Sequence, residues 1–158
     1  MLPRVCAGLI FPLVAFAPGC GSKGAVSLLA HVERPELSAS PNALDLLVLE
    51  GGFDLVLELG DAAPRGTTVT LGTFGIEDAG GTVLVDRLDA PSSTEFPVTL
   101  GAGDTVTARC ELAAGEVVDP TEGDVCAGDI RIAGVITDTL SDGRPTRVTS
   151  NLFRASCD

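Results

Sequence analysis

Tryptophan and tyrosine are absent from this chain, and histidine and lysine each occur once, as His31 and Lys23. Without Trp and Tyr, the chain lacks the usual flat surfaces for stacking sugars and the aromatic anchors common at protein interfaces, unless its Phe residues supply them. A single histidine allows no multi-histidine metal site, and a Ser-His-Asp or Cys-His arrangement would have to use His31. We interpret His31 as a solvated residue near the start of the domain, and we expect no catalytic residues.

Positive charge is also scarce. The chain has 10 Lys and Arg against 22 Asp and Glu, which gives a formal net charge of −12. Recognition of nucleic acids or anionic lipid headgroups needs clusters of Lys and Arg, and the nine arginines are scattered along the sequence. We therefore expect no nucleic-acid partner. Cationic partners and divalent metal ions are the ligands that suit this charge.

The N-terminal segment has the layout of an export signal. It has one basic side chain, Arg4, then an apolar run over residues 5–16 and small residues before Cys20. A transmembrane anchor is the weaker interpretation, because a spanning helix needs about 20 apolar residues. This run is shorter, and Pro12 would remove one of its helix hydrogen bonds.

Two cleavage sites compete at the end of this segment. Residues 15–17 are Ala-Phe-Ala, which is the small-x-small pattern of an ordinary signal peptide. Cleavage there would make Pro18 the first mature residue, and its ring would fix the backbone beside the scissile bond. The alternative is cleavage after Gly19. Residues 17–20 read Ala-Pro-Gly-Cys and resemble the lipobox of bacterial lipoproteins, in which the cysteine is invariant.

The resemblance implies that residues 1–19 are a lipoprotein signal peptide and that Cys20 carries the lipid. Its sulfur would bear a diacylglyceryl thioether and its new α-amine an acyl chain. Each buried methylene contributes about 0.8 kcal/mol, so this lipid would hold the protein on the membrane. Residues 20–24 would form a small polar tether, and Gly21 in place of Asp favours the outer membrane of the cell envelope. Secretion, or release into the periplasm, is the main alternative.

Residues 25–158 are expected to form a single all-β domain. Apolar and polar side chains alternate with period two over residues 53–59, and turn signals recur every 8–15 residues with no convincing amphipathic helix. The expected strands are residues 25–31, 44–50, 53–59, 67–73, 82–88, 96–100, 105–112, 129–139 and 146–155, with a connection over 33–42 and an acidic loop over 113–128. We expect about eight short strands from these nine candidate ranges, and such a set predicts an antiparallel, immunoglobulin-like β-sandwich. A small β-barrel is the alternative.

The cysteines allow at most one disulfide in the domain. Cys6 leaves with the signal peptide and Cys20 carries the lipid, so Cys110, Cys126 and Cys157 remain. In an antiparallel hairpin, the numbers of two facing residues always add to the same sum. For a turn centred within residues 141–143 this sum is about 283 to 285. The numbers of Cys126 and Cys157 add to 283.

We therefore predict a Cys126–Cys157 disulfide, although a bulge at Gly134 would shift this register by one. Cys110–Cys126, Cys110–Cys157 and no disulfide are the alternatives. Cys110 would then be a buried thiol, and as a nucleophile it would need a nearby activator.

The acidic loop is the weak candidate for a metal site. Its carboxylates could wrap Ca²⁺, which takes six to eight oxygen ligands. The loop lacks the D-x-[DN]-x-[DN]-G calcium pattern, and Pro120 and Gly123 are typical of a turn. We interpret it as a solvated loop and expect no metal or cofactor. The weak candidate ligands are Glu116, Asp119, Glu122 and Asp124.

These features rank three hypotheses. The first is a membrane-anchored envelope lipoprotein whose non-catalytic β-domain binds an unknown envelope protein or ligand or has a structural role. The second is a secreted or tethered adhesion module that depends on a ligand or Ca²⁺. The third is a carboxylate-based hydrolase, because 22 acidic residues offer many pairs and glycoside hydrolysis needs only two.

Overall fold

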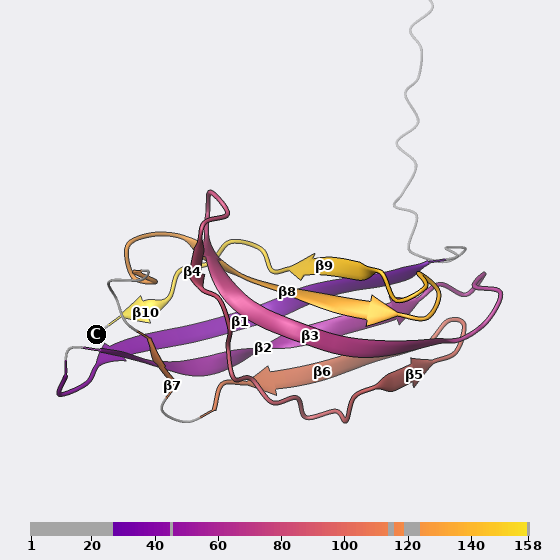
Figure 1. The fold of residues 1–158 in the computed structure, drawn as a ribbon, viewed down its shortest axis with the longest axis horizontal. Helices are drawn as coiled ribbons and strands as arrows, with labels where there is room; N and C mark the ends of the chain where they lie inside the picture. Colours follow the sequence, from indigo (N-terminus) through magenta and orange to yellow (C-terminus); the bar gives the residue numbers. More distant parts are fainter. Residues whose placement is uncertain (1–26, 45, 114–115, 119–123, 158) are drawn as a thin grey trace, which may run out of the picture.

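The computed structural model describes residues 27–44, 46–113, 116–118 and 124–157. These residues form two five-stranded sheets, packed face to face, and no helix (Figure 1). The strands are β1 (Leu28–Pro41), β2 (Leu47–Leu59), β3 (Thr67–Asp78), β4 (Val83–Val85), β5 (Val98–Leu100), β6 (Thr105–Glu111), β7 (Glu116–Val118), β8 (Ile130–Asp138), β9 (Pro145–Thr149) and β10 (Ser156–Cys157). The predicted β-sandwich is confirmed. The barrel alternative is wrong, because no strand ladder joins the two sheets into a closed barrel.

The expected signal peptide (1–19) and tether (20–24), with the cleavage residue Gly19 and the lipidation residue Cys20, lie outside the described residues. Within the described part, no helix is long and apolar enough to cross a membrane.

The strand order is that of an immunoglobulin-type sandwich. The first sheet has the order β10-β1-β2-β6, with β7 pairing β2, and the second has the order β4-β3-β8-β9, with β5 pairing β3. If β1, β2, β3, β6, β8 and β9 are taken as strands A, B, C, E, F and G, the sheets are A-B-E and C-F-G, and β4 lies where variable-type domains add strand C′. This order places strands that are distant in sequence side by side.

The first two strands are longer than the sequence indicated. The expected connection over residues 33–42 is wrong, because β1 continues through it to Pro41. The register against β2 shifts between Glu33 and Glu36. This bulge accommodates Pro35, which has no backbone N–H and is tolerated at such irregularities.

Gly51 and Gly52 were expected to separate two strands, and this is also wrong, because both lie inside β2. A Cβ at Gly51 would fall on the carbonyl oxygen of Glu36, and one at Gly52 would fall on that of Cys110. Gly51 also has φ of +129°, which disfavours a side chain. Close approach of the strands on either side requires these glycines, whereas the sequence alone suggested a turn.

Two phenylalanines pack at the centre of the core. The rings of Phe53 on β2 and Phe74 on β3 have centroids 5.0 Å apart and are both buried. Gly134 on β8 pairs with Phe74, and a Cβ there would lie 2.6 Å from Cε1 of the ring. In antibody domains a Trp on strand C packs against a disulfide between strands B and F. Here the contact between the corresponding strands β2, β3 and β8 is made by Phe53, Phe74 and Gly134.

The chain enters the sandwich at one end and finishes at the other (Figure 1). The amide N–H of Gly60 donates to the carbonyl of Ser27 (3.3 Å), so β1 begins beside the β2–β3 turn. We call this the entry end; it also carries the turns at residues 101–104 and 139–144. The far end carries the β1–β2 connection and β10, where Cys157 pairs with Ala39.

Candidate functional site

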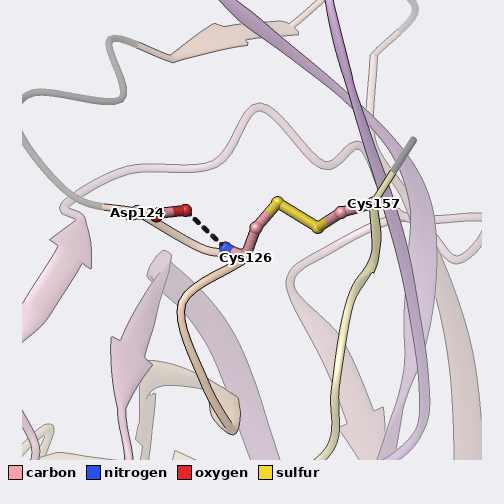
Figure 2. The surroundings of a disulfide bond; sticks show 3 residues. All are labelled: Asp124, Cys126 and Cys157. Atoms are coloured by element: carbon pink, nitrogen blue, oxygen red, sulfur yellow. Dashed lines mark hydrogen bonds between the residues drawn. A yellow bond between two sulfur atoms is a disulfide. The ribbon is translucent and has the colours of Figure 1, made fainter.

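A disulfide closes the far end of the sandwich. The structure joins Cys126 and Cys157, whose Cα atoms are 6.1 Å apart, and this is the pairing predicted from the sequence. Figure 2 shows that Asp124 accepts a hydrogen bond at Oδ1 from the backbone N–H of Cys126 (2.8 Å). This bond fixes the turn before β8. Cys157 is exposed and Cys126 is half-buried, so solvent can reach the bridge.

The hairpin that motivated this pairing is shorter than assumed. In the β8–β9 ladder, facing residue numbers add to 282, as for Gly134 and Val148. Nearer the far end, Ile130 and Phe153 pair with a sum of 283, so the register slips by one between these positions. Gly134 itself pairs regularly and is not the bulge. Cys157 pairs with β1, so the predicted cysteines meet beyond the hairpin ladder.

Cys110 is a buried thiol, as expected. It is 1% exposed in the main core cluster, and its Sγ lies 4.0 Å from the carbonyl oxygen of Ala108. Burial raises the pKa of this thiol above its usual value and outweighs the opposing effects of Ser92 and Arg109. The thiol therefore stays protonated and is a poor nucleophile.

The structure does not bring His31 to this thiol. His31 is part-exposed on the surface, and its Nε2 lies 3.0 Å from Oε1 of Glu33. Cys110, in contrast, points into the core. The two residues that a Cys-His arrangement would need therefore lie in different environments.

A buried carboxylate lies on the outer face of the first sheet. Asp54 is 2% exposed, although its alternation with Phe53 and Leu55 indicated a solvated position. Its carboxylate is paired with the guanidinium of Arg34 and with Nη1 of Arg109 (3.4 Å). These two arginines cover it. A buried charge of this kind is tolerated because it is paired.

The arginine contacts extend this cluster across three strands. Glu33, Asp54 and Arg109 are register partners on β1, β2 and β6. Arg109 also lies 3.7 Å from carboxylate oxygens of Glu36 and Glu111. We call the residues Arg34, Glu36, Asp54, Arg109 and Glu111 the Asp54 cluster. One signal for this cluster is visible in the sequence, an acidic residue within an apolar strand, but its arginine partners are 20 and 55 residues away.

Arg34 reaches Asp54 from a strained backbone. Its φ is +43°, in the left-handed region, directly before Pro35. Left-handed conformations are unfavourable for a residue with a Cβ, and a following proline restricts the backbone further. The β1 bulge holds this conformation, and it directs the guanidinium to the buried carboxylate.

The second sheet carries a shallow groove on its outer face. Its volume is about 280 Å³, and its floor contains Gly75 and Ala133, with Val85 on one side. Glu77 lies at the groove and is paired with Arg131 (3.1 Å) and with Arg147. One carboxylate between two guanidinium groups leaves a formal charge of +1 at this ion pair, and Asp86 also lines the groove. The groove therefore combines small apolar side chains with charged groups of both signs.

The weak metal candidates are only partly placed. Asp119 and Glu122 lie outside the described residues, and Glu116 is described only as part of the β7 backbone. Asp124 lines a cleft of about 380 Å³ at the far end, together with Asp78 and Asp129. Among the described residues, no group of three or more His, Cys, Asp and Glu side chains is arranged to hold a metal ion.

A second buried carboxylate organises the β8–β9 turn. Asp138 accepts hydrogen bonds from the backbone N–H groups of Leu140 (2.8 Å) and Ser141 (3.0 Å), and from the Thr67 hydroxyl (3.3 Å). Burial acts to raise its pKa, but the hydrogen bonds from Ser141, Leu140 and Thr67 together lower it below the usual value. Asp138 thus fixes the turn as an anion.

Comparison with known proteins adds no relative to this description. No protein-family model, curated protein or solved structure matches the chain.

Proposed function

We propose that the protein is a membrane-anchored envelope lipoprotein whose β-sandwich acts as a non-catalytic binding or structural module. The feature that carries the proposal is Cys20 in the Ala-Pro-Gly-Cys stretch, which resembles a lipobox. With Cys20 lipidated, the domain would be held permanently at a membrane surface. An outer-membrane location follows from Gly21 on the same resemblance.

The position of the entry end supports this arrangement. Six residues lie between Cys20 and Ser27, the first described residue, and the seven Cα–Cα steps of a fully extended chain span at most about 25 Å. The entry end would therefore face the membrane. The far end, with its disulfide and the cleft lined by Asp78 and Asp124, would point away from it.

A non-catalytic role is supported by how the buried and partly buried carboxylates are used. Asp54 is paired with two arginines, Glu77 with two more, and Asp138 with the backbone of its own turn. Catalytic acids and bases need pKa values near the working pH. Asp138, whose pKa is lowered, is instead held as a structural anion.

The state of the mature N-terminus tests the proposal. We would express the full chain in a bacterial host with its own signal segment and measure the intact mass and the N-terminal peptide. The expected product begins at Cys20 and carries a diacylglyceryl group and an amide-linked acyl chain. It should fractionate with membranes, whereas a Cys20→Ala variant should leave the membrane fraction or remain unprocessed.

A matched control is Ser22→Ala, which lies in the same tether and should change neither the processing nor the lipid mass. An unmodified mature chain that begins at Pro18 or Gly21 would refute the lipoprotein assignment. It would leave the protein as a secreted sandwich.

A further inference from the structure

The edge of β1 at the far end is covered by a very short strand. β10 has two residues and pairs in parallel with β1, through Ser38 with Ser156 and Ala39 with Cys157. β1 is the long strand at this side of the first sheet, and an uncovered edge strand exposes unpaired backbone groups. Two ladder pairs are a weak cover.

The chain before β10 is held independently of the disulfide. Phe153 and Ile130 exchange two backbone hydrogen bonds, of 2.8 and 2.9 Å, and Ala155 is buried in the second core cluster. Beyond Ala155, the described contacts that hold β10 are its ladder with β1 and the bond to Cys126. The bond therefore acts on β10 and on the turn that contains Cys126, and it does not join the core strands to one another.

The bridge can be reached by a reductant, whereas the remaining thiol cannot take part. Cys157 is exposed and Cys126 half-buried, and exposed disulfides are the more readily reduced ones. Cys110 is 1% exposed, and burial raises its pKa. Cys110 therefore does not attack the disulfide from within the protein. The disulfide is reduced by a thiol from outside the protein.

Opening the bond would also remove one restraint on a wall of the far-end cleft, where the Asp124–Cys126 hydrogen bond is another. The turn that contains Cys126 supplies Asp124, Ala127 and Asp129 to the cleft of about 380 Å³. Asp78, on the facing β3–β4 turn, is fixed separately by the N–H of Thr82 (2.8 Å). One wall is thus tied to the disulfide and the other is not.

We propose that the Cys126–Cys157 disulfide is a redox latch that controls the edge of β1 and the far-end cleft. A dithiol reductant supplies the two electrons. One of its thiolates attacks a sulfur of the bridge to give a mixed disulfide, and its second thiol then displaces the protein. Cys126 and Cys157 each end as a protonated thiol, and the dithiol ends as a disulfide. Reduction frees β10 and uncovers the backbone at Ser38 and Ala39.

The test uses the full chain as its host processes it, with dithiothreitol as the dithiol, under native conditions. Iodoacetamide then traps free thiols, and peptide mapping assigns each label, so the state of Cys20 does not enter the result. We expect Cys126 and Cys157 to be labelled while Cys110 stays protected. Hydrogen exchange should accelerate at least about tenfold in the peptide that contains Ser38 and Ala39, a local opening.

Peptides from β8 should still exchange much more slowly than the peptide that contains Ser38 and Ala39, because the core strands stay folded when the bridge opens. A Cys126→Ser, Cys157→Ser double variant should reproduce the exchange pattern without reductant, and Cys110→Ala should leave it unchanged. Labelling of all three cysteines together would show that reduction needs global unfolding and would overturn the proposal. Reduction without faster exchange at Ser38 and Ala39 would overturn it equally.

Discussion

Replacement of Gly134 by alanine would place a methyl group against the ring of Phe74. The new Cβ would lie 2.6 Å from Cε1 and 2.7 Å from Cγ, closer than real side-chain contacts allow. The ring has little freedom to move away, because Phe74 is 6% exposed and packs on Phe53 with centroids 5.0 Å apart. The clash must therefore be relieved by distorting the core.

The sign of the effect makes this variant informative. Where alanine fits, Gly→Ala stabilises by about 0.4–1 kcal/mol, because it restricts the unfolded chain. Overpacking a core costs about 1–3 kcal/mol. We therefore expect Gly134→Ala to lower the free energy of unfolding by about 1–2 kcal/mol. Gly128→Ala is the matched control, since no atom lies within 4 Å of its Cβ position, and it should be neutral or slightly stabilising.

Urea unfolding followed by far-UV circular dichroism measures the difference. Intrinsic Trp or Tyr fluorescence does not serve here, because the chain has neither residue. A Phe74→Ala background removes the colliding ring atoms, and there Gly134→Ala should cost nothing. Phe74→Ala alone costs about 3–5 kcal/mol, so Phe74→Leu is the milder background if that variant does not fold. If Gly134→Ala were as stable as Gly128→Ala, the packing explanation for this glycine would be refuted.

Three further outcomes follow from the other clusters. The double variant Cys126→Ser, Cys157→Ser should lower the free energy of unfolding by about 3.7 kcal/mol, because the unfolded chain gains the entropy that the bridge removes over a separation of 31 residues. Urea titration against the oxidised protein measures this difference, and an unchanged midpoint would contradict it. Asp138 has a lowered folded-state pKa, so its contribution is present above the unfolded pKa of about 3.9 and is lost as the pH falls through the folded value. The stability gap between the wild type and Asp138→Asn should therefore shrink from pH 7 to about pH 2, and a gap that widened would refute the assignment. Asp54→Asn should cost about 1.5–3 kcal/mol, because charge-assisted hydrogen bonds to a buried carboxylate are lost, whereas exposed Glu50→Gln should stay within about 0.5 kcal/mol in the same titration.

The alternation of apolar and polar residues predicted the sandwich, because period two defines two faces of a strand regardless of its neighbours. It located β6 and β8 to within a residue or two at each end. The constant sum across a hairpin identified the pair of Cys126 and Cys157, even though they meet beyond the ladder. The alternation of side chains and the sum of residue numbers across a hairpin can both be obtained from the sequence without knowing how the side chains pack.

The ends of the strands were predicted less well, because proline and glycine within a segment indicate a turn. Pro35 and the pair Gly51 and Gly52 look like breaks in the sequence, yet β1 and β2 run through them. A proline fits at a bulge, and a glycine fits wherever another strand approaches closely. Whether such a residue marks a turn or lies inside a strand depends on the neighbouring strand, which is distant in the sequence.

The sequence by itself predicted an all-β domain behind a segment that resembles a lipoprotein signal, and it favoured Cys126–Cys157 among the possible cysteine pairs, which is the pair in the structure. Only the tertiary structure decided that Asp54 is buried, because its covering arginines, Arg34 and Arg109, come from strands on either side of it. It also decided the role of Gly134, which depends on a ring 60 residues earlier in the chain. Alternation specifies which face a side chain occupies, and contacts across the sheet decide whether that face is open to water.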